Sequence, residues 1–336
     1  MSISAENLDD LLRLACEWQD QGRAVAIATV VQTWGSAPRQ AGSMLICETG
    51  GAFAGSVSGG CVEVNVIESA AAVIDEQRSK LLEFGVSDED AWSVGLACGG
   101  RIRVLVEPLD TAKRAIVDEL LQVKASQRSC VLAIQLGDAQ QRFVDLTDPD
   151  PLANAAVHAL RADKATSILL PEGEVFLLPI NPALRLIVVG AVHIAEPLIQ
   201  IARLAGYAVT LIDPRQAFAR GERFDDTPLL VDWPDIALRQ VVLDTRTAVV
   251  ALTHDPKIDD PALQAAVRSP AFYVGALGST RTHERRCARL QEQGLSAELL
   301  QRIHAPVGLN IGARSPAEIA ISIVAQMTSV LRQREL

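Results

Sequence analysis

Apolar residues in the first half of the chain recur at the intervals of alternating helices and strands. Leu8, Leu11 and Leu12 repeat at the three- to four-residue spacing of an amphipathic helix. Residues 24–31 form an apolar run of strand length, and residues 101–107 alternate between polar and apolar like a half-buried strand. The same criteria predict further elements at 44–47, 62–74, 112–123 and 130–136.

Residues 145–163 interrupt this pattern because they are polar and contain proline, so we expect a peripheral connection there. Asn181 and Pro182 then mark the end of this part of the chain. We place an N-terminal domain of mixed α/β architecture at residues 1–182.

A different pattern begins at residue 184. Residues 186–189 form a buried strand of parallel type that runs into Gly190. Residues 195–205 are helical, and residues 207–212 form a second strand that ends at Asp213. This strand–helix–strand order is typical of a nucleotide-binding βαβ unit.

The position of Asp213 fits the same interpretation. It follows Gly190 by 23 positions, close to the spacing at which an acidic residue binds a ribose 2′-hydroxyl. Further apolar strands are expected at 248–252 and 272–277. We therefore predict an α/β fold in which the N-terminal domain precedes a Rossmann-like, doubly wound parallel-sheet domain at residues 183–336.

The glycine fingerprint of that domain is incomplete. The chain reads Gly190-Ala191-Val192-His193-Ile194-Ala195, so Val192 stands where a second glycine would let the backbone approach a pyrophosphate. Two alternatives stay open: a retained fold with weak or absent dinucleotide binding, and a loop that still binds NAD(P).

Composition places the chain among ordinary globular proteins. It has 336 residues, of which 49% are hydrophobic and 21% charged. No apolar run reaches the ~18 residues of a membrane span, so no membrane association is expected. Residues 1–10 lack the basic and apolar regions of a signal peptide, which indicates a cytoplasmic protein whose six cysteines are reduced.

The charge is unevenly distributed. Residues 1–183 carry 14 Lys and Arg against 25 Asp and Glu, whereas residues 184–336 carry 17 against 16. These net charges of −11 and +1 give the total of −10. An acidic half argues against nucleic acid, which needs a basic surface. It is either a solvated surface or a docking surface for a protein partner.

Two cysteines stand beside glycine pairs, in Ser58-Gly59-Gly60-Cys61-Val62-Glu63 and in Cys98-Gly99-Gly100-Arg101. Glycine lets a backbone turn sharply and approach a ligand, and a thiolate is a soft ligand for metals and sulfur chemistry. Cys61 precedes a predicted helix whose N-terminus would stabilise a thiolate. The other four cysteines, Cys16, Cys47, Cys130 and Cys287, are interpreted as packing residues.

With these residues in view, the chain resembles the xanthine dehydrogenase accessory protein family, XdhC, over nearly its whole length. In the N-terminal half the resemblance lies in segments 35–39, 55–63 and 98–100. In the C-terminal half it lies in segments 212–215, 253–255, 275–279, 281–283, 304–309, 311–313 and 316–320. Val192 and Thr280 depart from the family pattern, where glycine and a basic residue are usual.

The resemblance implies a chaperone that binds molybdenum cofactor (molybdopterin) as cargo. Such a protein protects the cofactor while a cysteine desulfurase supplies its terminal sulfur, and then hands it to an apo-molybdenum hydroxylase of the xanthine dehydrogenase type. Cys61 is the candidate contact to the metal. The candidate cofactor-binding residues are Arg39, Gly59, Gly60, Cys61, Glu63, Cys98, Gly99, Gly100, Gly190, His193, Asp213, Arg215, His254, Gly278 and Arg281.

Several alternatives stay open for these residues. Arg39 either holds the pterin phosphate or forms an ion pair with Glu63, and Glu63 could instead cap its own helix start. A cluster of His193, His254, His283 and His304 could bind a metal, although histidines satisfied by backbone groups are commoner.

The competing function is a NAD(P)-dependent oxidoreductase that uses Gly190 and Asp213, but no acid–base dyad accompanies them. We expect handover of the cofactor without turnover, at a cleft shared by the two domains. A homodimer is compatible with the sequence, which does not fix the oligomeric state.

Overall fold

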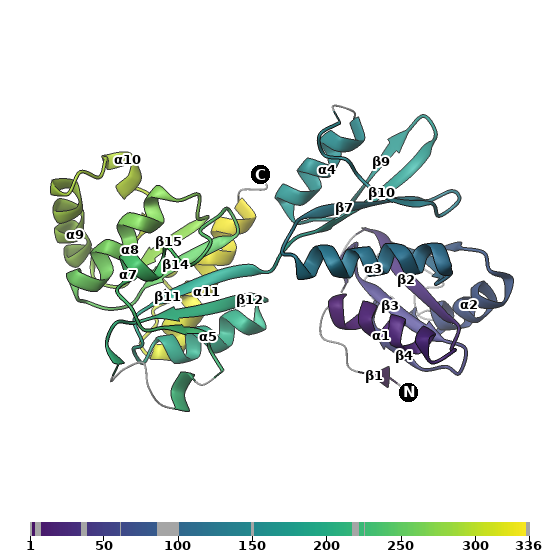
Figure 1. Cartoon of the computed structure of the whole chain (residues 1–336), viewed down its shortest axis with the longest axis horizontal. Helices are drawn as coiled ribbons and strands as arrows, with labels where there is room; N and C mark the ends of the chain where they lie inside the picture. Colours follow the sequence, from purple (N-terminus) through teal and green to yellow (C-terminus); the bar gives the residue numbers. More distant parts are fainter. Residues whose placement is uncertain are drawn as a thin grey trace. The chain divides into compact units, whose positions relative to one another are not determined.

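The chain forms two compact units, Met1–Pro182 (unit 1) and Ala183–Leu336 (unit 2) (Figure 1). The structure is a computed structural model that describes residues 2–3, 8–34, 39–60, 62–85, 101–148, 151–216, 222–224 and 226–333. Each unit has its own sheets and its own hydrophobic clusters.

The main sheet of unit 1 has six strands in the order β1-β4-β3-β2-β6-β5. Its central strand β2 pairs antiparallel with both neighbours, β3 and β6. A register shift between Val30 and Gln32 interrupts the pairing of β2 with β6. The strands are Ser2–Ile3 (β1), Val25–Trp34 (β2), Met44–Glu48 (β3), Phe53–Gly55 (β4), Lys80–Phe84 (β5) and Arg101–Pro108 (β6).

Helices cover both faces of this sheet because its strands are buried on both sides. Helix α2 (Glu63–Glu76) packs the apolar stripe of Val66, Ala70 and Val73 onto one face. Helices α1 (Leu8–Asp20) and α3 (Thr111–Ala125) pack on the other face, where Asp110 caps α3 by accepting from the Lys113 amide.

A second sheet completes unit 1, with four antiparallel strands in the order β8-β7-β10-β9. Its strands are Cys130–Gln135 (β7), Gln141–Phe143 (β8), Thr166–Leu170 (β9) and Gly173–Ile180 (β10). One face joins the cluster under α1 and α3, and the other carries helix α4 (Pro151–Ala162).

Helix α4 corrects the prediction of a peripheral connection at 145–163. Leu152, Ala156 and Ala159 lie at helical spacing and are buried, Leu152 and Ala156 against β7 and β10. Pro151 stands at the helix start, where its missing N–H costs nothing. The polar residues before the helix obscured this short apolar stripe.

Unit 2 contains one sheet whose six strands are all parallel, in the order β13-β12-β11-β14-β15-β16. This is the doubly wound Rossmann order, so the predicted fold of this domain is confirmed. The strands are Leu184–Val189 (β11), Tyr207–Ile212 (β12), Leu229–Leu230 (β13), Thr247–Ala251 (β14), Tyr273–Ala276 (β15) and Ile303–His304 (β16).

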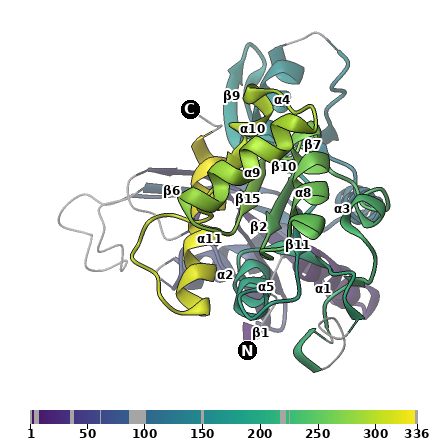
Figure 2. The same ribbon diagram turned by 90° about the vertical axis from the view of Figure 1, so that its left-hand side faces the viewer.

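Helices lie on both faces of this sheet, as the two views show (Figures 1 and 2). Helices α5 (Ala195–Leu204) and α11 (Pro316–Gln333) cover one face. The other face carries α7 (Pro234–Ala237), α8 (Pro256–Arg268), α9 (Thr280–Glu292) and α10 (Ala297–Leu300). A short 3-10 helix, η1, spans Glu222–Phe224. Within the described parts of the chain, no helix has both the length and the apolar character that a membrane crossing requires.

Candidate functional site

The loop at residues 56–60 wraps around the side chain of Glu63. The backbone amides of Val57, Ser58 and Gly59 donate to Glu63 Oε1 at 3.2, 2.9 and 2.9 Å, and the Gly60 amide donates to Oε2 at 2.8 Å. The hydroxyls of Ser56 and Ser58 donate to the same carboxylate. Gly59 and Gly60 have φ angles of +86° and +126°, which let consecutive amides converge on one anion.

This carboxylate is buried and ionised. Burial alone would raise the pKa of Glu63, but the hydrogen bonds from Ser58, Ser56 and the Gly60 amide outweigh it and lower the pKa to about 2. The loop amides that the sequence suggested for a cofactor are therefore occupied by an anion of the chain itself. Glu63 caps its own loop and helix start, which was one of the two expected roles.

The cysteine of this motif and the whole second motif lie outside the described residues. These are Cys61, Cys98, Gly99 and Gly100. Helix α2 begins at Glu63, two residues after Cys61 in the sequence. Arg39 is exposed and forms no ion pair with Glu63, whose partners are the loop amides and serines. Of the two roles expected for Arg39, the ion pair is thus absent from the described structure.

A groove of about 530 Å³ lies where β2, β5 and β6 come together at one end of the main sheet. We call it the β2–β6 groove; it is lined by Gln32, Trp34, Glu83, Phe84, Gly85, Arg101, Ile102 and Arg103. Trp34 directly precedes the motif segment 35–39, and Arg101 directly follows Cys98-Gly99-Gly100. The groove therefore borders, in the sequence, two of the three N-terminal motif segments.

Arg103 forms the polar floor of this groove. Its Nε lies 3.1 Å from Glu83 Oε1, and its Nη1 donates to Gln32 Oε1 at 2.8 Å and to Glu174 Oε2 at 2.9 Å. Arg101 is exposed and has no hydrogen bond or ion pair with any residue that the structure describes. Sequence reasoning missed Trp34 and Arg101 as site residues; their signal was adjacency to the two motifs.

In unit 2 the sequence-predicted residues gather at the carboxyl ends of the strands. Strand order reverses between β11 and β14, which is where ligands bind in open α/β sheets. Gly190 follows β11 with a φ of +111°, and an added Cβ there would lie 2.5 Å from Thr253 Cγ2. Glycine is thus needed at this position for packing against the loop after β14.

Asp213 is fully buried in this region and binds protein donors. Its Oδ2 accepts from the Ala191 amide at 2.7 Å and from Arg215 Nη2 at 2.7 Å, and its Oδ1 accepts from Arg215 Nε at 2.9 Å. Burial opposes ionisation, but the Arg215 side chain and these amides hold the pKa of Asp213 below its usual value. Protein donors therefore take the place that the spacing suggested for a ribose hydroxyl.

A second groove of about 530 Å³ opens beside this pair. We call it the β14 groove; it is lined by Val192, Arg215, Leu252, Thr253, His254, Asp255 and Pro256. It brings together two predicted site residues, Arg215 and His254, with Val192, which narrows it. The structure thus joins the loops after β11, β12 and β14 at the expected position.

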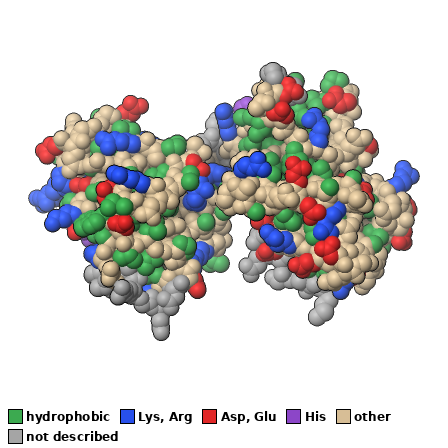
Figure 3. Space-filling model, viewed as in Figure 1, with side chains coloured by type: hydrophobic (Ala, Val, Ile, Leu, Met, Phe, Trp, Pro, Cys, Tyr) green, Lys and Arg blue, Asp and Glu red, His purple; other side chains and the backbone are tan. Residues whose placement is uncertain are grey.

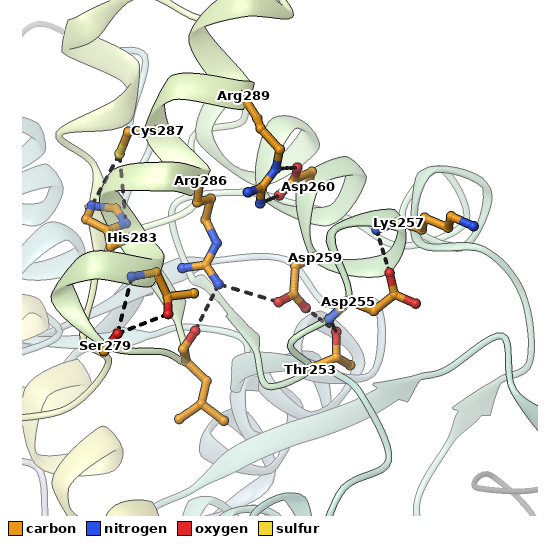
Figure 4. Close-up of polar contacts among 12 residues, drawn as sticks. Thr253, Asp255, Lys257, Asp259, Asp260, Ser279, His283, Arg286, Cys287 and Arg289 are labelled. Atoms are coloured by element: carbon orange, nitrogen blue, oxygen red, sulfur yellow. Dashed lines mark hydrogen bonds and ion pairs between the residues drawn. The ribbon is translucent and has the colours of Figure 1, made fainter.

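Behind the β14 groove lies a buried polar network that the sequence did not reveal (Figure 4). Thr253 Oγ1 donates to Asp259 Oδ1 at 2.5 Å, and Arg286 Nη2 donates to the Leu277 carbonyl at 2.8 Å and lies 3.5 Å from Asp259 Oδ2. Burial raises the pKa of Asp259 to about 6. Nε and Nη1 of Arg286 have no hydrogen-bond partner within the described structure.

The remaining predicted residues of unit 2 are dispersed. His193 is exposed beside Glu196 and Arg223, and Arg281 is exposed on α9, which follows the Gly278 turn. His283 contacts Cys287 one turn along the helix, as Figure 4 shows, and His304 stacks on Tyr273 with ring centroids 4.7 Å apart. Among the described residues, no three His, Cys, Asp or Glu side chains lie close enough to hold a metal.

The four cysteines interpreted as packing residues are free thiols in the structure. Cys16 and Cys47 are buried, and Cys130 and Cys287 are half-buried. Burial raises the pKa of the thiol at all four positions. Their environments therefore favour the neutral thiol, in keeping with packing.

The surface of unit 1 mixes both signs of charge. On the face shown in Figure 3, acidic and basic side chains are interspersed over this unit. That face has no continuous basic surface, among the residues described, of the kind that a phosphate backbone requires.

Family comparisons match both units. A model of the XdhC Rossmann domain matches residues 186–327, and a model of the XdhC and CoxI family matches residues 18–85. A relative from Escherichia coli (strain K12), named molybdenum cofactor insertion chaperone PaoD, is 30% identical over 97% of this chain and 89% of its own length. This chain belongs to the XdhC family.

Two further XdhC-type similarities extend over the whole chain. A Bacillus subtilis (strain 168) protein, named as a probable component of xanthine dehydrogenase, is 29% identical over 92% of this chain and 93% of its own length. A crystal structure described as a xanthine dehydrogenase from Bacillus halodurans has a TM-score of 0.76, with 26% identity and 96% of each chain covered. The resemblance found in the sequence motifs is thus confirmed for both units.

Proposed function

We propose that this protein is a molybdenum cofactor chaperone, which binds the cofactor, protects it during sulfuration and passes it to a hydroxylase of the xanthine dehydrogenase type. The observation that carries the proposal is the similarity to the Escherichia coli insertion chaperone, which extends over 97% of the chain. The name of the Bacillus subtilis relative supports a client of the xanthine dehydrogenase class.

The described side chains are suited to holding a ligand. The Glu63 carboxylate fixes the loop that leads to Cys61, so that the backbone beside this cysteine is pre-organised. Arg39 and Arg101 are exposed guanidinium groups beside two motif segments, and guanidinium binds phosphate with two parallel hydrogen bonds. In this proposal Cys61 is the thiol that contacts the metal or its sulfur.

The remaining parts of the proposal concern the partners. A cysteine desulfurase supplies the terminal sulfur while the chaperone holds the cofactor, and an apo-hydroxylase receives the product. The handover takes place in the cytoplasm, and the acidic surface of unit 1 serves the docking of a client. A homodimer is the assembly in which we expect the chaperone to act.

An oxidoreductase that uses unit 2 receives no support from the geometry. The acid expected to bind ribose already accepts from Arg215 and the Ala191 amide. Val192 lines the β14 groove where a glycine would admit a pyrophosphate. We therefore place the cofactor with the motifs of unit 1.

The experiment co-expresses an apo-molybdenum hydroxylase with and without this protein, and measures client activity and sulfurated cofactor. We expect activity to rise in its presence; unchanged activity would contradict the chaperone function. A second measurement compares molybdopterin retained by wild type, Cys61→Ala and Cys130→Ala. Retention is expected to fall markedly in Cys61→Ala alone, because Cys130 is a packing thiol at the start of β7. Wild-type retention in a folded Cys61→Ala protein would remove Cys61 from the site.

A further inference from the structure

The β2–β6 groove presents an exposed indole on one face of the main sheet, beside a guanidinium that no described residue pairs. Trp34 is 44% exposed, although large aromatic side chains of this kind are usually mostly buried. It pairs across the strands with Arg101, and Gln32 pairs with Arg103. Cross-strand partners have their Cβ atoms about 5 Å apart on the same face, so these side chains form one surface.

A bulge in β2 creates this arrangement. Before it, Ala28 and Val30 pair with Val106 and Val104 and belong to the cluster under α2. Strict alternation would keep Gln32 and Trp34 on that face, because side chains repeat every two residues. The register shift between Val30 and Gln32 instead turns both to the face of Arg101 and Arg103. Bulges re-aim side chains in this way next to functional sites.

Three further features leave room and hydrogen-bonding capacity beside Trp34. The side chain of Glu83 is 70% exposed, with one oxygen 3.1 Å from Arg103 Nε. Gly85 lies against the Arg101 side chain, and an added Cβ there would approach Arg101 Cγ to 3.2 Å. The volume of about 530 Å³ is within the range of small-molecule sites.

We propose that the β2–β6 groove binds the pteridine ring system of the cofactor. Trp34 stacks on the ring plane, as aromatic side chains do on planar heterocycles. The Glu83 carboxylate accepts from the amino and ring N–H donors of the aminopyrimidinone edge, an acid–amidine pairing that neutral side chains cannot match in strength. Arg101 donates to the anionic side of the ligand. This assignment rests on the proposed chaperone function and locates the ring of its cargo.

The test measures binding of pterin-6-carboxylate to the full-length protein by equilibrium dialysis, with GMP as the second ligand. GMP shares the aminopyrimidinone edge but carries a purine in place of the pteridine. We expect Trp34→Ala to weaken pterin-6-carboxylate binding at least tenfold, about 1.4 kcal/mol, and Trp34→Phe to retain most of it. Trp233→Ala is the matched control, because Trp233 is 47% exposed and lies in unit 2.

Two more variants separate stacking from polar recognition. Glu83→Gln removes the charge of the acceptor and is expected to weaken binding severalfold. Gly85→Ala crowds Arg101 from below and is expected to act like Arg101→Gln, with a smaller effect. Circular dichroism of each variant establishes that the fold is retained.

The results distinguish this inference from the chaperone function. The inference fails if Trp34→Ala binds pterin-6-carboxylate and retains molybdopterin like the wild type, or if GMP binds as tightly as the pterin. It also fails if the wild type binds neither the probe nor the cofactor. The chaperone function fails instead when wild type binds the pterin but leaves the co-expressed client inactive.

Discussion

The charged groups at the strand ends of the two units differ in what they bind. In unit 2, Asp213 and Arg215 bind each other, and the Ala191 amide supplies a further donor to the same carboxylate. In unit 1, Arg101 has no partner among the described residues and Trp34 is exposed beside it. A polar group that the fold already satisfies contributes to stability, whereas an unsatisfied, exposed one is available to a ligand.

This difference reverses the expectation that a Rossmann fold places the ligand in its own crevice. Unit 2 has the strand order and the position of such a site, but its acid is engaged internally. Fold alone therefore does not locate the ligand, since sites are defined by the groups they present. Unit 1 also contains one internally satisfied anion, Glu63, which sits at the motif loop and serves to shape it.

The largest effect is expected at Glu63, where the internal anion holds a motif loop. Glu63→Gln replaces an acceptor by an amide whose N–H₂ faces loop donors, so unit 1 should lose on the order of 3 kcal/mol of stability at pH 7. The folded pKa of about 2 lies below the ordinary value of 4.5 for this side chain. Its stabilisation is therefore present above pH 4.5 and is lost as the pH falls toward 2. Urea unfolding across this window measures both.

The control is Glu68→Gln on the same helix, because Glu68 is exposed and its replacement should change stability by less than about 0.5 kcal/mol. The difference between wild type and Glu63→Gln should shrink as the pH falls from 4.5 to 2. A difference that is constant with pH would show that the ionised carboxylate does not hold the loop.

A smaller effect is expected at Asp213, and on stability alone. Asp213→Asn removes the charge that Arg215 binds but keeps one acceptor for the Ala191 amide, so we expect a loss of about 2 kcal/mol in unit 2. Retained molybdopterin should stay at the wild-type level, because this acid binds protein and not cargo. Thermal unfolding and pterin content after acid extraction give the two readouts, with exposed Asp226→Asn as the control. Loss of pterin in a stable Asp213→Asn protein would return the site to unit 2.

The sequence predicted the framework of unit 2 closely because its strands are fully buried. Residues 207–212 were predicted as a strand and form β12 with the same bounds, since an unbroken apolar run leaves few alternatives. Helix α4 escaped prediction because its stripe of Leu152, Ala156 and Ala159 is short and follows a polar segment. Local pattern thus identifies elements best where burial is continuous.

The candidate sites depended on contacts between distant residues, which a pattern along the chain cannot show. The β2 bulge between Val30 and Gln32 decides which face Trp34 occupies, and no residue type announces it. The engagement of Asp213 depends on the Ala191 amide 22 residues earlier in the chain. The role of Glu63 was accessible to sequence reasoning because its partners lie within seven residues.

The smallest effect is expected at Val192, the residue that breaks the glycine fingerprint. Val192 lines the β14 groove, so Val192→Gly would widen the approach to the strand-end loops. Asp213 would still be engaged by Arg215 and the Ala191 amide, and no ribose acceptor would be released. We therefore expect calorimetry with NAD, NADP and their reduced forms to show no tight binding before or after the substitution. A micromolar dissociation constant, about −8 kcal/mol, in Val192→Gly alone would show that valine, and not the internal ion pair, keeps dinucleotides out of unit 2. The same affinity in the wild type would show that the loop binds a dinucleotide around the valine, and the contrast between the two units would fail.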